Sequence, residues 1–162
     1  MKQLMTWRPH ACWFLLLFVG TGFSQAGQFV LNGGFENDFN GWQLSGDVRL
    51  ETNSPLDGKA SANIGPGAGS LTQRIETGSG NDLTVSAIIQ PQRTNGWIFA
   101  VKFLDKNQRE VMRVDSLTDL ERDKKDPRQF SHYMKAHPLT KWVEITISKD
   151  SSEGSVWVDQ VG

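Results

Sequence analysis

The sequence predicts an all-β domain, a β-sandwich of the jelly-roll type, on two observations. From Gln28 onward, apolar residues mostly alternate with polar ones in short runs, which is the two-residue period of half-buried strands. Gly, Asn, Asp or Pro bounds these runs about every ten residues, and such regular turn signals are typical of sandwiches and jelly rolls. Helical spacing of apolar residues is almost absent.

The strands expected from this alternation follow one another along most of the chain. They are residues 28–32, 42–51, 59–65, 70–76, 82–90, 97–105, 110–116, 129–136, 142–149 and 155–161. The glycine-rich segments "GPGAGS" and "ETGSGND" are interpreted as connections. Neither follows a strand and opens a helix, as a phosphate-binding loop must.

The segment "SLTDLERDKKDPR" departs from the strand pattern. Ser116 followed by Asp119 could cap a single helical turn, but the mixed charges that follow favour a solvated loop. A lid over one face of the sandwich is the functional alternative, because long loops in compact domains are often binding loops.

Residues 1–26 are predicted to be a secretory signal peptide. Lys2 and Arg8 precede the apolar run "ACWFLLLFVG", and the segment ends in "SQA", with the small residues that a signal peptidase needs. The run is too short to span a bilayer as a permanent helix, although an uncleaved anchor is the competing interpretation. We therefore expect a secreted or periplasmic protein that starts at Gly27 and does not stay inserted in a membrane.

The remaining residues, 27–162, fit one domain with a sizeable core, and we expect a monomer. The leader carries two of the 17 Lys and Arg residues and none of the 18 acids, so the net charge of the domain is −3. This charge does not indicate a nucleic-acid partner. The domain contains no cysteine, so its stability must come from core packing or from a bound metal.

The stretch "ENDFNGWQLSGD" has the acid spacing of a helix-loop-helix calcium loop. That interpretation is rejected, because such a loop needs flanking helices and the residues on both sides of this stretch are predicted strands. Turn formation by Asn and Gly explains the match.

The same region, "NGGFENDFNGW", resembles the N-terminal signature of jelly-roll carbohydrate-binding modules of the kind appended to xylanases, laminarinases and cellulases. Two later stretches fit the pattern in order: "SPLDGKASANIG", with the Gly-Lys strand opening, and the terminal "VWVDQVG". The resemblance covers residues 28–162 and implies a galactose-binding-domain-like β-sandwich that binds a polysaccharide or oligosaccharide without catalysis.

The resemblance also implies one structural calcium ion. By position, its side-chain ligands would be Glu36 and Asp159, with carbonyl oxygens near Gly34 and Lys59. A hard cation prefers several oxygens, and two carboxylates from opposite chain ends would repel each other without a cation between them. The alternative is that Glu36 and Asp159 cap turns or pair with Lys59. Trp42 is then expected in the core.

Glycan binding needs exposed aromatic rings flanked by hydrogen-bonding side chains. Tyr133 alternates with polar residues and is therefore expected on an exposed face. Trp97 shares its parity with the core residues that follow it, but it begins its strand and is expected to reach the rim. The polar partners proposed for these two rings are Gln90, Arg93 and Arg113.

The sequence gives less support to an enzymatic function. There is no Gly-x-Ser-x-Gly motif, and His132 and His137, the histidines of the domain, lack the spacing of a helical metal pair. His132 alternates with Phe130 and Met134 and is expected in the core. A small polysaccharide-degrading enzyme that uses paired carboxylates and a protein-interaction domain on the same scaffold remain the alternatives.

Overall fold

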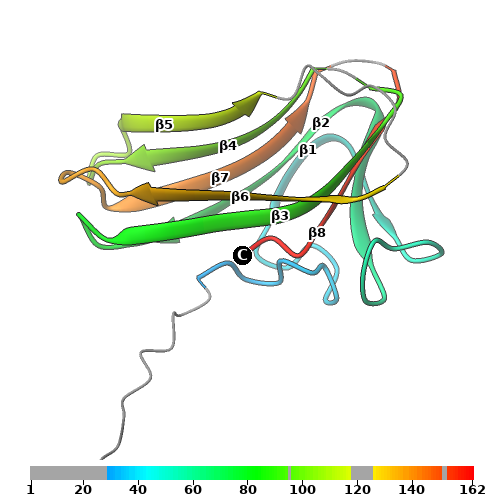
Figure 1. The fold of residues 1–162 in the computed structure, drawn as a ribbon, viewed down its shortest axis with the longest axis horizontal. Helices are drawn as coiled ribbons and strands as arrows, with labels where there is room; N and C mark the ends of the chain where they lie inside the picture. The colour runs from blue at the N-terminus through cyan, green and yellow to red at the C-terminus, as the bar shows by residue number, and fades with distance from the viewer. Residues whose placement is uncertain (1–28, 95, 118–125, 151–152) are drawn as a thin grey trace, which may run out of the picture.

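Figure 1 shows a fold built from β-strands, which confirms the all-β prediction. The computed structural model describes residues 29–94, 96–117, 126–150 and 153–162. Its strands are β1 (Gln43–Glu51), β2 (Ser61–Glu76), β3 (Asp82–Gln92), β4 (Trp97–Leu104), β5 (Glu110–Leu117), β6 (Arg128–Lys135), β7 (Trp142–Lys149) and β8 (Ser155–Asp159). The predicted cap at Asp119 lies outside the described residues. Within them, no helix is long and apolar enough to cross a membrane.

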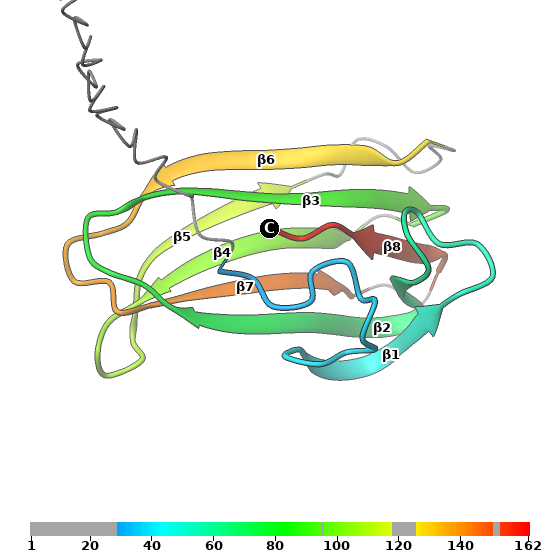
Figure 2. The ribbon, with the colours of Figure 1, turned by 90° about the horizontal axis from the view of Figure 1, so that it is seen from below.

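The strands form one antiparallel sheet that folds over into two layers. Its order is β5-β4-β7-β2-β8-β3-β6, and β1 pairs with β2. β4 and β6 are far apart in this order, yet the rings of Trp97 and Phe130 lie 5.4 Å apart and those of Phe99 and His132 lie 5.9 Å apart. Figure 2 shows β6, β3 and β8 in front of β5, β4 and β7. We call these the β3 layer and the β4 layer.

β2 belongs to both layers and joins them. Its residues 62–64 pair with β8, whereas residues 69–76 pair with β7. The segment 65–70, expected to be a connection, therefore lies inside one long strand. Glycine eases this course: a Cβ on Gly69 would lie 3.0 Å from the carbonyl oxygen of Ser45 on β1, so β1 would have to shift slightly to admit a side chain there.

The core fills the space between the layers and follows the predicted alternation. Phe99, Val101 and Phe103 are fully buried, and they face the β3 layer. Trp42 is also buried, as expected, and its ring lies 5.4 Å from that of Phe35.

The strand expected at 28–32 is not a strand in its described part. Leu31 donates its N–H to Oε1 of Gln73 at 2.7 Å, and Nε2 of Gln73 donates to the Leu31 carbonyl at 2.9 Å. A buried side-chain amide therefore holds this segment in place of a backbone ladder. The last expected strand ends at Asp159, because Gln160 adopts a positive φ of 48°.

Candidate functional site

The carboxylates of Glu36 and Asp159 lie on opposite ends of the chain and come together beside the loop before β2. Oε1 of Glu36 accepts hydrogen bonds from the backbone N–H groups of Lys59 at 2.7 Å and Ala60 at 3.3 Å. Oδ2 of Asp159 accepts from the Ser61 hydroxyl at 2.7 Å and from the Asp57 N–H at 3.0 Å. Both acids therefore clamp the same loop.

Gly34 lies between the two carboxylates. A Cβ at this position would lie 3.9 Å from Cγ of Glu36 and 3.8 Å from Oδ1 of Asp159, so both side chains border the same small space. Asp57, which the sequence did not single out, joins them through Gln160, whose Nε2 donates to Oδ2 of Asp57 at 2.9 Å. We call Glu36, Asp57 and Asp159 the carboxylate cluster.

Burial raises the pKa of Asp159 above its ordinary value. Hydrogen bonds from Ser61, Gln160 and the Asp57 N–H lower it only in part, and the Asp57 charge raises it further. The cluster is therefore a place where negative charge is imperfectly compensated, and its hard oxygen donors suit Ca²⁺. No three His, Cys, Asp or Glu side chains of the described residues are already arranged as metal ligands, so calcium stays a prediction.

The structure places Trp97 in the core, with 2% of its surface exposed. Its ring packs edge-on against Phe130 of the facing layer. The prediction that Trp97 stacks on a glycan at the rim is therefore wrong, because neither ring face is open to a ligand.

The other four predicted glycan residues do not form one site. Tyr133 is 73% exposed on the outer face of the β3 layer, opposite Thr84, whereas Gln90 lies six residues further along β3 and is buried. At the usual strand rise, six residues correspond to about 20 Å. Arg93 follows the end of β3, and Arg113 lies on β5 in the other layer. The proposed partners are therefore too far apart to contact one sugar ring together.

The outer face of the β4 layer gathers a larger set of polar side chains, which the sequence did not single out as a site. Its strands bend upward toward one end in Figure 1, so this face is concave. Strand register places the following polar residues on it, and we call them the polar face: Gln43, Ser45, Ser70, Thr72, Arg74, Lys102, Arg113, Asp115, Glu144, Thr146 and Ser148. The apolar residues Ile98, Ala100 and Trp142 lie on the same face. Alternation with buried neighbours, as in Val143-Glu144-Ile145, is the signal that could have found it.

A row of ion pairs crosses the polar face from strand to strand. Glu144 on β7 accepts from Lys102 on β4 at 3.2 Å and from Arg74 on β2 at 2.5 Å. Burial alone would raise the pKa of Glu144, but hydrogen bonds from Arg74 and Lys102 outweigh it and hold the pKa below its ordinary value. On β5, Arg113 and Asp115 form a second pair at 2.6 Å. The charged groups are thus fixed in place by one another.

Hydroxyl groups continue the polar face beside this row. The side-chain oxygens of Thr72 and Thr146 lie 3.3 Å apart, and Ser70 and Ser148 are opposite each other in the next register row. At the other side, the loop between β4 and β5 reaches over the sheet, because Oε1 of Gln108 accepts from Arg74 at 2.9 Å. The arrangement offers many oriented donors and acceptors, which suit a ligand rich in hydroxyl groups.

Comparison of the sequence with protein-family models and with curated proteins finds no match. Comparison of the structure does find similar solved structures. A family 16 carbohydrate-binding module has a TM-score of 0.68 and 14% identity, with 83% of this chain and 97% of that chain covered. A family 61 carbohydrate-binding module, solved in complex with β-1,4-galactotriose, has a TM-score of 0.58 and 20% identity, with 82% and 94% covered.

The fold is that of these β-sandwich modules. The resemblance inferred from the sequence is therefore confirmed at the level of the fold. The enzymatically active domain of tailspike protein 4 from bacteriophage CBA120 is also similar, with a TM-score of 0.66 and 18% identity over 82% of this chain. This chain spans only 20% of that tailspike chain, so the likeness covers one part of it.

Proposed function

We propose that this domain is a non-catalytic glycan-binding module. The observation that carries the proposal is the fold likeness to two carbohydrate-binding modules, each covered over nearly its whole length, one of them solved with a bound galactotriose. The matched part is therefore the whole of each module and not a shared fragment.

We place the glycan on the polar face. Ion pairing between Lys102, Glu144 and Arg74 fixes donors and acceptors before a ligand arrives, which lowers the entropy cost of binding. Neighbouring strands bring successive side chains about 4.8 Å apart across the sheet, so a chain lying across the strands meets polar groups repeatedly. Hydrogen bonds would make most of the contacts, because the ring that register places on this face is Trp142, at the start of β7, and the exposed Tyr133 is on the other layer.

The charges of the polar face favour binding over hydrolysis. A glycosidase needs one carboxyl group with a raised pKa to protonate the leaving oxygen. Hydrogen bonds from Arg74 and Lys102 instead keep the pKa of Glu144 low, and Asp115 is engaged by Arg113. These acids are suited to accepting hydrogen bonds from sugar hydroxyls.

The carboxylate cluster is proposed to hold a structural calcium ion. Glu36 and Asp159 would supply side-chain oxygens, Asp57 is a further candidate, and carbonyls near Gly34 and Lys59 would complete the set. The ion would neutralise the buried charge of Asp159 and tie the segment before β1 to the end of β8. We further propose export, with residues 1–26 removed and residues 27–162 acting outside the cytoplasm.

A glycan-array screen of the protein tests the proposed function, followed by titration calorimetry with the best ligand. Thr146→Lys places a long side chain in the middle of the polar face and is expected to abolish binding, whereas Tyr133→Ala, on the other layer, is expected to leave it unchanged. Loss of binding in Tyr133→Ala alone would move the site to the β3 layer. Absence of any glycan ligand would favour the protein-interaction alternative.

A further inference from the structure

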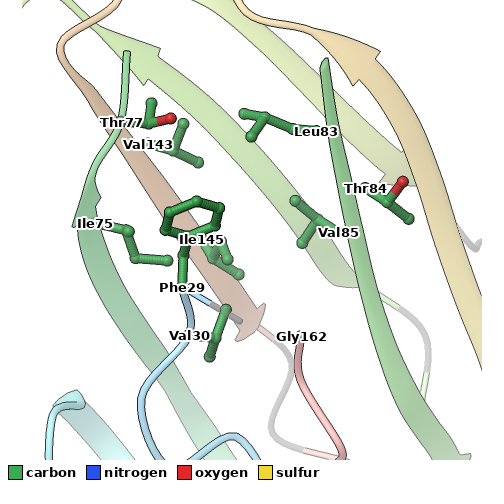
Figure 3. A pocket seen from close by; sticks show the side chains of 10 residues that line it. All are labelled: Phe29, Val30, Ile75, Thr77, Leu83, Thr84, Val85, Val143, Ile145 and Gly162. Carbon is green, nitrogen blue, oxygen red and sulfur yellow. The ribbon is translucent and has the colours of Figure 1, made fainter. Parts of the chain in front are cut away.

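A separate pocket opens between the two layers, away from the polar face and the carboxylate cluster. Figure 3 shows the side chains around it, which come from the segment before β1, from β2, β3 and β7 and from the C-terminal end of the described chain. The lining residues are Phe29, Val30, Ile75, Thr77, Leu83, Thr84, Val85, Val143, Ile145 and Gly162. Most of them are apolar, so the pocket is an opening into the core.

The pocket exists because strand pairing stops on both of its sides. β1 pairs with β2 only as far as Thr72, so Ile75 and Thr77 lie beyond that ladder. On the facing strand, the backbone of Ser86 exchanges two hydrogen bonds with Gly162, and Leu83 lies beyond that pair. The seam between the end of β2 and the start of β3 is therefore filled by side chains in place of a ladder.

The size of the pocket limits what it can hold. Its volume is about 70 Å³. An apolar cavity of about 150 Å³ takes up a benzene molecule, and drug-sized pockets begin at about 300 Å³. The pocket therefore fits a group of only a few carbon atoms. Phe29, which is 55% exposed, is itself a lining residue, and its ring lies among Ile75, Val85 and Ile145 in the view of Figure 3.

One polar atom gives the pocket a chemical preference. Oγ1 of Thr77 is buried and has no hydrogen-bond partner in the structure. In the structure this atom is closed off from the pocket, so the Thr77 side chain must rotate about χ1 to reach a carbonyl oxygen there. A buried hydroxyl without a partner is unfavourable, and the rotation would give it a hydrogen bond. The surrounding valine and isoleucine side chains would meanwhile contact an alkyl group.

We propose that this pocket binds a short acyl group, such as an acetyl or propionyl group, whose carbonyl oxygen accepts a hydrogen bond from Thr77 and whose alkyl end packs between Ile75, Val85 and Ile145. The proposal does not depend on glycan binding. The acyl group would be a substituent on a larger ligand, because the pocket is open to solvent and too small for more.

Primary amides of increasing chain length, from acetamide to hexanamide, are suitable probes, with binding followed by methyl NMR shifts of the full protein. Each methylene that enters the pocket should strengthen binding about fourfold. This gain should stop once the pocket is filled, at a chain of about three or four carbons. Shifts should be confined to the methyl groups that line the pocket. A gain that continues through hexanamide, or shifts spread over the surface, would overturn the proposal.

Two threonine variants test the hydrogen bond. Thr77→Val keeps the shape of the side chain but removes the hydroxyl, and it should weaken binding of propionamide about three- to tenfold. Thr140→Val is the matched control, because Oγ1 of Thr140 is also buried without a partner but does not line the pocket. Equal affinities of wild type and Thr77→Val would overturn the assigned role of Thr77. Equal losses in both variants would show a nonspecific effect and overturn it as well.

Discussion

Removal of one negative charge from the carboxylate cluster should abolish calcium stabilisation while leaving the fold intact. The change to make is Glu36→Gln, because the side-chain oxygen of glutamine can still accept the hydrogen bonds from Lys59 and Ala60. Without calcium, the variant should therefore unfold within about 0.5 kcal/mol of wild type. The variant should be less stable than wild type only when calcium is present, because the substitution removes the charge of Glu36 and keeps its hydrogen bonds to the loop.

The size of the effect follows from linkage between binding and folding. An ion that binds only the folded state stabilises it by about 2.7 kcal/mol at a hundred times its dissociation constant and by about 4.1 kcal/mol at a thousand times. For a domain of this size, 1 kcal/mol corresponds to roughly 4 °C in midpoint temperature. Wild type should therefore gain on the order of 10 °C from saturating calcium. Glu36→Gln and Asp159→Asn should lose most of this gain.

Thermal unfolding with calcium and with chelator measures these gains directly. Glu51→Gln is the matched control, since the Glu51 carboxylate also accepts hydrogen bonds from two backbone N–H groups, those of Asn53 and Ser54, but lies outside the carboxylate cluster. It should keep the full calcium gain. Equal midpoints for wild type in calcium and in chelator, with no metal found by elemental analysis, would refute the calcium assignment and leave the cluster as a loop clamp.

Three further results are expected. Mass spectrometry of the exported protein should show Gly27 as its first residue, and an intact Met1 would contradict the signal peptide. Trp97→Ala should lower the free energy of unfolding by about 3–5 kcal/mol in urea titrations, because it empties core volume, whereas the exposed Tyr133→Ala should change it by less than about 0.5 kcal/mol. Glu144 has a folded-state pKa below its ordinary value of 4.5, so its contribution to stability is present above that pH and is lost as the pH falls through the folded-state pKa. Glu144→Gln should therefore be less stable than wild type near neutral pH, with a smaller difference near pH 3, and a difference that does not depend on pH would contradict this account.

The sequence by itself determined the strands and most of their inner faces. The alternation in "WIFAVKFL" predicted the buried row of Phe99, Val101 and Phe103, because successive side chains on a strand point to opposite faces whatever lies next to them. The same pattern at Trp97 indicated the core, and the structure shows that position at the start of the strand did not bring the ring to the rim. Local alternation was the better guide there.

The glycine-rich segment 65–70 shows that local sequence signals do not always predict secondary structure. In isolation, "GPGAGS" has the composition of a turn, and the pairing of β2 before it, at residues 61–64, and after it, from Gly69 onward, keeps it within one strand. For residues 28–32 the prediction is wrong in the opposite sense. Its residues suit a strand, but the buried Gln73 amide provides the hydrogen bonds that a neighbouring strand would have given.

Tertiary structure alone decided which side chains meet. Alternation assigns Tyr133 and Glu144 each to the outer face of a strand, but it does not say that these faces belong to opposite layers, because strand order depends on contacts between residues far apart in the chain. The row from Lys102 through Glu144 to Arg74 joins residues from three strands and exists only once the sheet has formed. Glu36 and Asp159 were placed together in advance by the resemblance and not by any local pattern. The sequence determines locally which side chains of a strand alternate between its two faces. The site depends on which strands pair, in which register and in which layer, and only long-range pairing decides this.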